Sequence, residues 1–227
     1  MAGKMSLANN SLVYGGDHTL QIIDGKLFSC GGNSHGQLGL GDTCKRGTPT
    51  LVGVFSDWSS VAAGEGHSLA IRRGKLFAWG RRSGGAGSSL FPVQIGEKDN
   101  WERVFARKGS SFAIANGELF SWGENPHGQL GLGNFLPQEN PLRVGTFSDW
   151  DVFSLGEDHA AAIRQGRLYA WGKNDKGQLG PGKASLEPSP VRVDSHSDWK
   201  DVRARKHHTL ASRNGGLFSW GKISPWA

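Results

Sequence analysis

The heptapeptide HGQLGLG occupies residues 35–41, and the same seven letters return at residues 127–133. A third version, KGQLGPG, occupies residues 176–182. Its glycines favour the positive φ angles of tight corners, its leucine can fill a gap between packed elements, and its glutamine amide can satisfy backbone groups outside a strand. The recurrence predicts one kind of connector, used several times in a repeated structure.

A second motif, an apolar segment that ends in Trp-Gly in all copies but the first, sets the length of the repeat. Its copies start 49, 43, 49 and 49 residues apart. An earlier tryptophan keeps the same spacing, at Trp58, Trp101, Trp150 and Trp199, with Asn9 in the first copy. The chain is therefore one unit written five times, with the segments GKLFSCG (25–31), GKLFAWG (74–80), GELFSWG (117–123), GRLYAWG (166–172) and GGLFSWG (215–221).

Each unit has the pattern of antiparallel strands that are covered on both faces. The apolar run SLAI (68–71) precedes a turn closed by glycine and then the Trp-Gly segment, as in a β-hairpin. Both alternating faces of residues 76–79 are apolar, so both need cover. A unit of about 40 to 50 residues with about four strands is typical of a β-propeller blade. We therefore expect an all-β propeller whose blades are held together by Trp79, Trp122, Trp171 and Trp220.

The pattern W..V..G..H..A...G.L..WG.N..GQLG.G, which covers residues 9–221, resembles the repeat of the regulator of chromosome condensation family. The resemblance implies a propeller in which sequence repeats are offset from blades and the two chain ends pair to close the ring. Propellers of that family usually have seven blades, whereas this chain has five repeats. We expect a single domain over residues 1–227, with repeats at approximately 9–57, 58–100, 101–149, 150–198 and 199–227.

The incomplete first and last copies bear on ring closure. Five repeats can form a closed five-bladed ring, because propellers of about four to eight blades occur. We expect residues 1–8 and 222–227 to approach one another and complete one blade, which would leave no open sheet edge. The alternative is an open arc that another chain completes.

The second unit departs from the others in its connector. In place of GQLG it has RRSGGAGSS at residues 81–89, a flexible and basic segment without the leucine. Either this is a deletion without functional consequence, or the loop faces a partner with Arg81 and Arg82.

Composition limits the class of protein. The chain has 227 residues, enough to bury a core, and two cysteines, too few for a disulfide framework. The sequence contains neither a secretory signal nor a run of about 20 apolar residues. We expect a soluble, non-secreted protein without a membrane partner. The formal net charge of +6 mildly favours acidic partners.

Histidines recur at one position of the unit and raise the question of a metal site. They are His18, His67, His159 and His208, with Ser110 in the third copy. A ring of metal ligands is disfavoured because Ser110 interrupts it and no closely spaced Cys or Asp cluster completes a site. We expect each histidine to bond within its own blade. GQLGLG also lacks the glycine order of a phosphate loop, and catalytic motifs are absent, so we expect no enzyme, cofactor or metal.

The four residues that end at the histidine position carry charges that change sign between copies. They read GGDH (15–18), GEGH (64–67), RKGS (107–110), GEDH (156–159) and RKHH (205–208). Equivalent turns fall on one rim of a propeller, which is either a solvated surface or a docking face for a partner of complementary charge. Alternating signs also suit a two-fold dimer. The residues expected to bind a partner are Glu65, Arg107, Lys108, Glu157, Asp158, Arg205 and Lys206, with Arg81 and Arg82.

These features favour a non-enzymatic interaction scaffold that binds other proteins through a charged rim, as a homo-oligomer or within a larger assembly, a virion included. Two alternatives stay open. A carbohydrate-binding propeller also places aromatic residues and glycine turns between blades. The family resemblance implies guanine-nucleotide exchange and chromatin binding, although the sequence has neither a wedge-like insertion nor a basic tail. Nucleic-acid binding is disfavoured because the basic residues are scattered.

Overall fold

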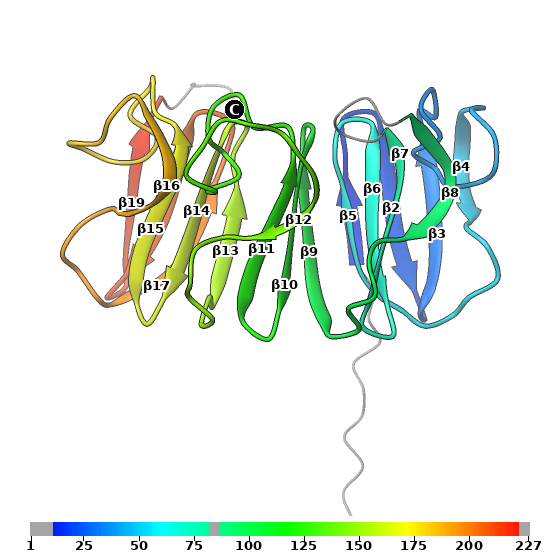
Figure 1. Ribbon diagram of the computed structural model, residues 1–227, viewed down its shortest axis with the longest axis horizontal. Helices are drawn as coiled ribbons and strands as arrows, with labels where there is room; N and C mark the ends of the chain where they lie inside the picture. The colour runs from blue at the N-terminus through cyan, green and yellow to red at the C-terminus, as the bar shows by residue number, and fades with distance from the viewer. Residues whose placement is uncertain (1–10, 82–86, 223–227) are drawn as a thin grey trace, which may run out of the picture. The chain divides into compact units, whose positions relative to one another are not determined.

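The computed structural model describes residues 11–81 and 87–222. The regular secondary structure in those ranges consists of strands alone. The strands form five antiparallel sheets (Figure 1). None of the described segments is a helix long and apolar enough to span a bilayer. The all-β class expected from the sequence is confirmed. The expected completion of one blade by residues 1–8 and 222–227 falls mostly on residues outside the described ranges, and it stays a prediction.

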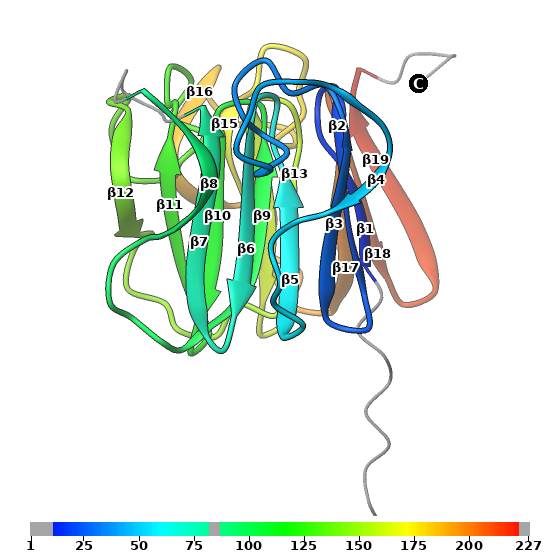
Figure 2. The ribbon, with the colours of Figure 1, turned by 90° about the vertical axis from the view of Figure 1, so that its right-hand side faces the viewer.

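Four sheets have four strands and the last has three, each in chain order. The first holds β1 (Ser11–Tyr14), β2 (His18–Ile23), β3 (Lys26–Gly31) and β4 (Arg46–Leu51). The second holds β5 (Trp58–Ala63), β6 (His67–Arg72), β7 (Lys75–Arg81) and β8 (Ser88–Gln94), which lie side by side in Figure 2. The third holds β9 (Trp101–Arg107), β10 (Ser110–Ala115), β11 (Glu118–Gly123) and β12 (Gln138–Arg143). The fourth holds β13 (Val152–Leu155), β14 (His159–Arg164), β15 (Arg167–Lys173) and β16 (Leu186–Arg192), and the fifth holds β17 (Trp199–Ala204), β18 (His208–Arg213) and β19 (Gly216–Gly221).

The chain divides into two compact units, residues 1–113 and 114–227. The first and second sheets lie in the first unit, and the fourth and fifth lie in the second. The boundary falls within β10 of the third sheet. Each unit therefore contains one complete interface between two whole sheets.

The hairpin between the second and third strand of each sheet has a two-residue turn of type I′. In the first sheet Asp24 and Gly25 have φ angles of 48° and 75°, a combination that favours glycine at the second place. The carbonyl oxygen of Gly25 accepts the N–H of Trp58 at 3.0 Å, so this turn fixes the start of the next sheet. The same bond joins Gly74 to Trp101, Gly117 to Trp150 and Gly166 to Trp199.

In the four-stranded sheets, the glycine near the end of the third strand marks a β-bulge in its pairing with the fourth strand. The pairing of β7 with β8 shifts register between Ala78 and Gly80, and Gly80 has a φ of 81°. A Cβ at Gly80 would lie 2.5 Å from the carbonyl oxygen of Gly66, so the turn beside it leaves no room for a side chain. The fourth strand of each four-stranded sheet is an edge strand and contains a proline, which has no N–H to offer for pairing; these prolines are Pro49, Pro92, Pro141 and Pro190.

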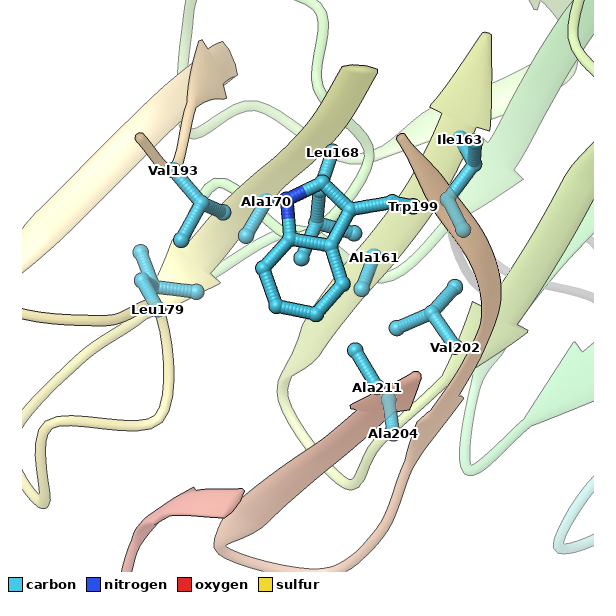
Figure 3. Packing of buried hydrophobic residues seen from close by; sticks show 10 residues of the cluster. All are labelled: Ala161, Ile163, Leu168, Ala170, Leu179, Val193, Trp199, Val202, Ala204 and Ala211. Carbon is cyan, nitrogen blue, oxygen red and sulfur yellow. The ribbon is translucent and has the colours of Figure 1, made fainter. Parts of the chain in front are cut away.

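The core lies between successive sheets. In the second unit, residues of the fourth sheet and its connector pack against β17 and β18 of the fifth, with the indole of Trp199 in the middle of the cluster (Figure 3). Trp79, Trp122 and Trp171 are buried as expected, while Trp220 is half-buried. The cluster consists of Ala161, Ile163, Leu168, Ala170, Leu179, Val193, Trp199, Val202, Ala204 and Ala211.

The GQLG connectors behave as the sequence predicts. Leu38, Leu130 and Leu179 are fully buried. The side-chain oxygen of Gln37 accepts the N–H of His35 at 2.9 Å, and its backbone oxygen accepts the indole N–H of Trp79 at 2.9 Å. The second bond recurs from Trp171 to Gln129 and from Trp220 to Gln178. Each connector therefore fixes the indole of the following sheet.

Candidate functional site: the rim of charged turns

Beneath the charged turns, three histidines, His18, His67 and His159, each join their sheet to the next one. The Nε2 atom of His18 lies 2.8 Å from the Ser68 hydroxyl, and that of His67 lies 2.9 Å from the Ser111 hydroxyl. In the second unit His159 Nε2 lies 3.0 Å from Thr209 Oγ1. The expectation that these histidines bond within their own blades is therefore wrong. A repeat fixes the position of a polar side chain along the chain, but it does not say which neighbour that side chain meets.

The hydrogen count fixes the direction of two of these bonds. Ser68 has one hydroxyl hydrogen and donates it to the backbone oxygen of Gln37 at 2.7 Å, so His18 must donate through Nε2–H. Thr209 likewise donates to the oxygen of Gln178 at 2.8 Å, so His159 also donates. Both histidines therefore carry a proton on Nε2.

Burial keeps the histidines neutral. It lowers the pKa of His67 to about 4, helped by the charges of His18 and Arg81. Burial also lowers the pKa of His159 to about 4, against the opposing charge of Asp158. No group of three or more His, Cys, Asp or Glu side chains within residues 11–81 and 87–222 is placed to hold a metal ion. The hydrogen bonds of these neutral histidines connect neighbouring sheets next to the charged turns.

In the first unit the turns of three successive sheets are bonded edge to edge. The N–H of Gly16 donates to the oxygen of Gly64 at 3.0 Å, and the N–H of Glu65 donates to the oxygen of Lys108 at 2.9 Å. Arg81 joins the same edge, because its N–H donates to the oxygen of Gly66 at 2.7 Å. The backbone thus sets the spacing of the charges, while the side chains of Glu65, Arg81 and Arg107 are exposed and that of Lys108 is half-buried.

In the second unit the acidic side chains turn toward histidines. Glu157 lies 3.6 Å from Nε2 of His207, and Asp158 lies 3.9 Å from Nδ1 of His127. Both carboxylates are largely covered, with side-chain exposures of 22% and 12%. Arg205 and Lys206 are exposed. This part of the rim therefore presents its cations more openly than its anions.

The structure places eight of the nine expected partner-binding residues on these turns or beside them, and Arg82 lies outside the described residues. Sequence reasoning named Arg81, which follows one Trp-Gly segment, but missed the equivalent residues Lys173 and Lys222. The N–H of Lys173 donates to the oxygen of Asp158, and that of Lys222 donates to the oxygen of His207, both at 2.9 Å. Their recurrence directly after Trp-Gly was the available signal.

The chain matches the family model described as the regulator of chromosome condensation (RCC1) repeat over residues 24–71, 116–163 and 165–212. Each match begins at or beside a hairpin turn and takes the third and fourth strands of one sheet with the first two of the next. The offset between repeat and sheet implied by the resemblance is confirmed.

Curated relatives match shorter stretches. The chain is 42% identical over 76 residues to the dog X-linked retinitis pigmentosa GTPase regulator, 31% of this chain and 8% of that protein. It is 34% identical over 90 residues to the ultraviolet-B receptor UVR8 of Arabidopsis thaliana, 36% of this chain and 20% of the receptor. It is 39% identical over 70 residues to the human regulator of chromosome condensation, 29% of this chain and 17% of that protein.

Solved structures resemble nearly the whole chain. Human WBSCR16 matches with a TM-score of 0.77 and 23% identity, over 94% of this chain and 60% of that one. Prp20p of Saccharomyces cerevisiae matches with a TM-score of 0.57 and 20% identity, over 93% of this chain and 71% of that one. At these identities the likeness concerns the fold.

Proposed function

Because this chain belongs to the regulator of chromosome condensation repeat family, we propose that it is a protein-interaction propeller that binds partners through the rim of charged turns. The observation that carries this proposal is the exposure of Arg205 and Lys206 beside carboxylates that are covered and paired with histidines. Backbone hydrogen bonds between neighbouring turns hold the charges of the first unit at fixed spacing. A rigid array of charges favours partners of complementary pattern at little entropic cost.

The chemistry of the second unit's rim favours an acidic partner segment. Arg205 and Lys206 stand on the fifth sheet's turn, and the exposed Lys222 is tied to that turn through its backbone N–H. The nearby Glu157 lies 3.6 Å from Nε2 of His207, and its side chain is only 22% exposed. Attraction between exposed charges accelerates association and is screened by salt.

Relatives support the general class. The yeast propeller Prp20p binds Gsp1p and histones, and the dog relative is a GTPase regulator. This chain spans 71% of the solved Prp20p chain and 8% of the dog protein. Nucleotide exchange, chromatin binding and sugar binding are therefore separate hypotheses for this chain, and we place protein binding ahead of them.

The test compares two double charge reversals in the second unit. Arg205→Glu with Lys206→Glu changes the rim, and Arg167→Glu with Lys200→Glu makes the same change of charge at exposed positions at the opposite strand ends. Proteins captured by wild type and by each variant are quantified at low and at high salt. We expect the rim variant alone to lose salt-sensitive partners, roughly tenfold or more.

Equal capture by the wild type and both variants would remove the second unit's rim from consideration. Bound sugars on a glycan array would support the carbohydrate-binding alternative instead. Faster nucleotide release from a loaded small GTPase would support the exchange alternative.

A further inference from the structure

The cations on the turn of the fifth sheet have no acidic partner in the described part of the second unit. Arg205 and Lys206 belong to that turn, and Lys222 follows β19. Among the described residues of this unit, no carboxylate forms an ion pair with any of the three. The lysine after the fourth sheet's Trp-Gly segment, Lys173, instead lies 3.6 Å from Asp175. The fifth sheet therefore presents positive charge that the described residues of its unit do not neutralise.

Backbone contacts hold the two segments that carry these cations. The N–H of Arg205 donates to the oxygen of His208 at 2.8 Å, and the N–H of Lys222 donates to the oxygen of His207 at 2.9 Å. A Cβ at Gly156 would lie 2.5 Å from the oxygen of Arg205, so the turn of the fourth sheet also packs closely against this turn. Charged side chains that start from fixed backbone positions lose less entropy when a ligand binds.

The fifth copy of the unit combines a basic turn with a basic residue after the Trp-Gly segment, and the other copies do not. The third copy has the basic turn RKGS but Glu124 at the second position, and the first copy is basic at neither. The second and fourth copies have Arg81 and Lys173 at that position, but their turns GEGH and GEDH are acidic. The two positions are adjacent, because Arg81, Lys173 and Lys222 each donate their N–H to the turn of their own sheet. Two sources of positive charge therefore meet at the fifth sheet.

The number of cations favours a ligand with two negative charges. A carboxylate supplies one charge and two oxygen atoms. A phosphate monoester supplies a charge of about −1.5 to −2 at pH 7 and three acceptor oxygens, and an arginine can bind two of these oxygens at once. Glu157 competes little for the cations, because it faces His207 at 3.6 Å and is largely covered. A phosphate monoester therefore fits Arg205, Lys206 and Lys222 better than a single aspartate or glutamate does.

We propose that Arg205, Lys206 and Lys222 bind a phosphate monoester on a protein partner, carried by a phosphorylated serine or threonine. This inference rests on the proposed function, because it names the partner chemistry that the second unit's rim recognises. Arg205 binds two phosphate oxygens, and the two lysines neutralise the remaining charge. Binding then requires that the partner is phosphorylated, so modification of the partner switches the interaction on.

The experiment measures the affinity of defined probes for the full chain by nuclear magnetic resonance, through the amide signals of Lys206, His207 and Lys222. The main probe is a short glycine- and alanine-rich peptide with a central phosphoserine. Two matched peptides have an unmodified serine or a pair of glutamates at the centre. At pH 7.5 we expect the phosphoserine peptide to bind roughly fivefold or more tightly than the glutamate peptide, and the unmodified peptide to leave the signals unchanged.

Three variants and a matched control locate the site. Arg205→Gln with Lys206→Gln should weaken binding of the phosphoserine peptide roughly 5- to 10-fold, and Lys222→Gln about 2- to 5-fold, because an exposed ion pair contributes modestly. Lys222→Arg keeps the charge and should bind at least as tightly as the wild type. Arg167→Gln with Lys200→Gln removes two charges at the opposite strand ends and should leave binding unchanged. The dispersion of the amide signals checks that each variant is folded.

Three outcomes would overturn this inference. Equal affinity for the phosphoserine and glutamate peptides would mean that the site reads charge alone, and it would leave the proposed function standing. Tighter binding of inorganic phosphate than of the phosphoserine peptide would assign the site to a free anion. Equal binding of dimethyl phosphate would indicate the phosphodiester chemistry of a nucleic acid. The proposed function fails separately, when the charge-reversal variants described above capture the same proteins as the wild type.

Discussion

At the scale of single residues, the connector glycines combine a backbone requirement with a steric one. Gly131 and Gly177 have the same φ of 75°. A Cβ at Gly131 would lie 2.7 Å from the indole nitrogen of Trp171, whereas a Cβ at Gly177 would meet no atom within 4 Å. Alanine at Gly177 would therefore add only the strain of a left-handed backbone. Alanine at Gly131 would add the same strain and also a steric clash with the indole.

Gly131→Ala should destabilise the protein more than Gly177→Ala. The second change adds only left-handed strain, about 1 to 2 kcal/mol. The first also displaces the Trp171 indole from the oxygen of Gln129, which adds about 1 to 3 kcal/mol. Urea denaturation of both variants measures the difference. Equal losses would mean that the indole can move without penalty.

The histidine bridge is a second residue-scale feature. His18 and Ser68 form one such bridge within the first unit, and His159 and Thr209 form another within the second unit. A histidine without its hydroxyl would leave a buried N–H unsatisfied.

Ser68→Ala should lower the free energy of unfolding by about 1 to 3 kcal/mol, because His18 Nε2–H loses its acceptor. Adding His18→Ser removes the N–H donor that Ser68→Ala leaves without its acceptor. The double variant should then lose less than the sum of the single variants, by roughly 1 kcal/mol. A double-mutant cycle by chemical denaturation measures this coupling, and strict additivity would argue against the bridge.

At the scale of elements, the hairpins and connectors could be predicted from the sequence because their constraints are local. A glycine such as Gly25 closes a two-residue turn whatever lies around it. Leu38, Leu130 and Leu179 are fully buried, as the recurring GQLG pattern predicts for the leucine of the connector. Local backbone chemistry and apolar periodicity therefore sufficed for the strands and their order.

The partners of the polar side chains could not be predicted, because they belong to a different copy of the unit. The sequence places His159 at the end of a turn, but its acceptor Thr209 lies 50 residues further on. Bonds within one sheet are easier to find, because both positions recur at a fixed spacing in every copy. Asp149 bonds Arg164 at 2.6 Å, and the third copy has Asn100 and Ala115 at those two positions. The covering of Glu157 and Asp158 depends on His207 and His127 in the same way.

The interfaces between elements should make stability depend on pH. His67 and His159 have a pKa of about 4 in the folded state against 6.5 in the unfolded state, so the unfolded state binds more protons between these values. The free energy of unfolding should fall as the pH drops from 6.5 toward 4, by roughly 3 kcal/mol per histidine at the end of this window.

The carboxylates change the free energy of unfolding at lower pH than the histidines do. The contributions of the two kinds of group can therefore be measured separately. Hydrogen bonds to Arg72 and Arg164 lower the pKa of Asp57 and Asp149, so their contribution is lost only as the pH falls through those lowered values. Urea denaturation between pH 7 and pH 4.5 measures the histidine effect, and His67→Gln should reduce its slope. A flat profile over this range would contradict the burial of neutral histidines.

At the scale of the whole molecule, a chain of similar sheets should transmit damage mainly to neighbours. Stability in repeat proteins is approximately a sum of repeat terms and nearest-neighbour terms. The cluster between the fourth and fifth sheets includes the connector residue Leu179, and the separate cluster between the first and second sheets contains none of the same residues. The two interfaces can therefore be perturbed independently.

Leu179→Ala tests this independence. The change removes a fully buried side chain beside Trp199 and should weaken that interface by about 2 to 5 kcal/mol. We expect amide hydrogen exchange, measured by mass spectrometry, to accelerate in β17–β19, because β17 and β18 form one side of the weakened interface. Exchange in β1–β4 should change little, and Leu38→Ala at the equivalent connector should give the reverse pattern. A uniform loss of protection in both variants would mean that the sheets unfold as one cooperative body, in which the interfaces are coupled beyond nearest neighbours.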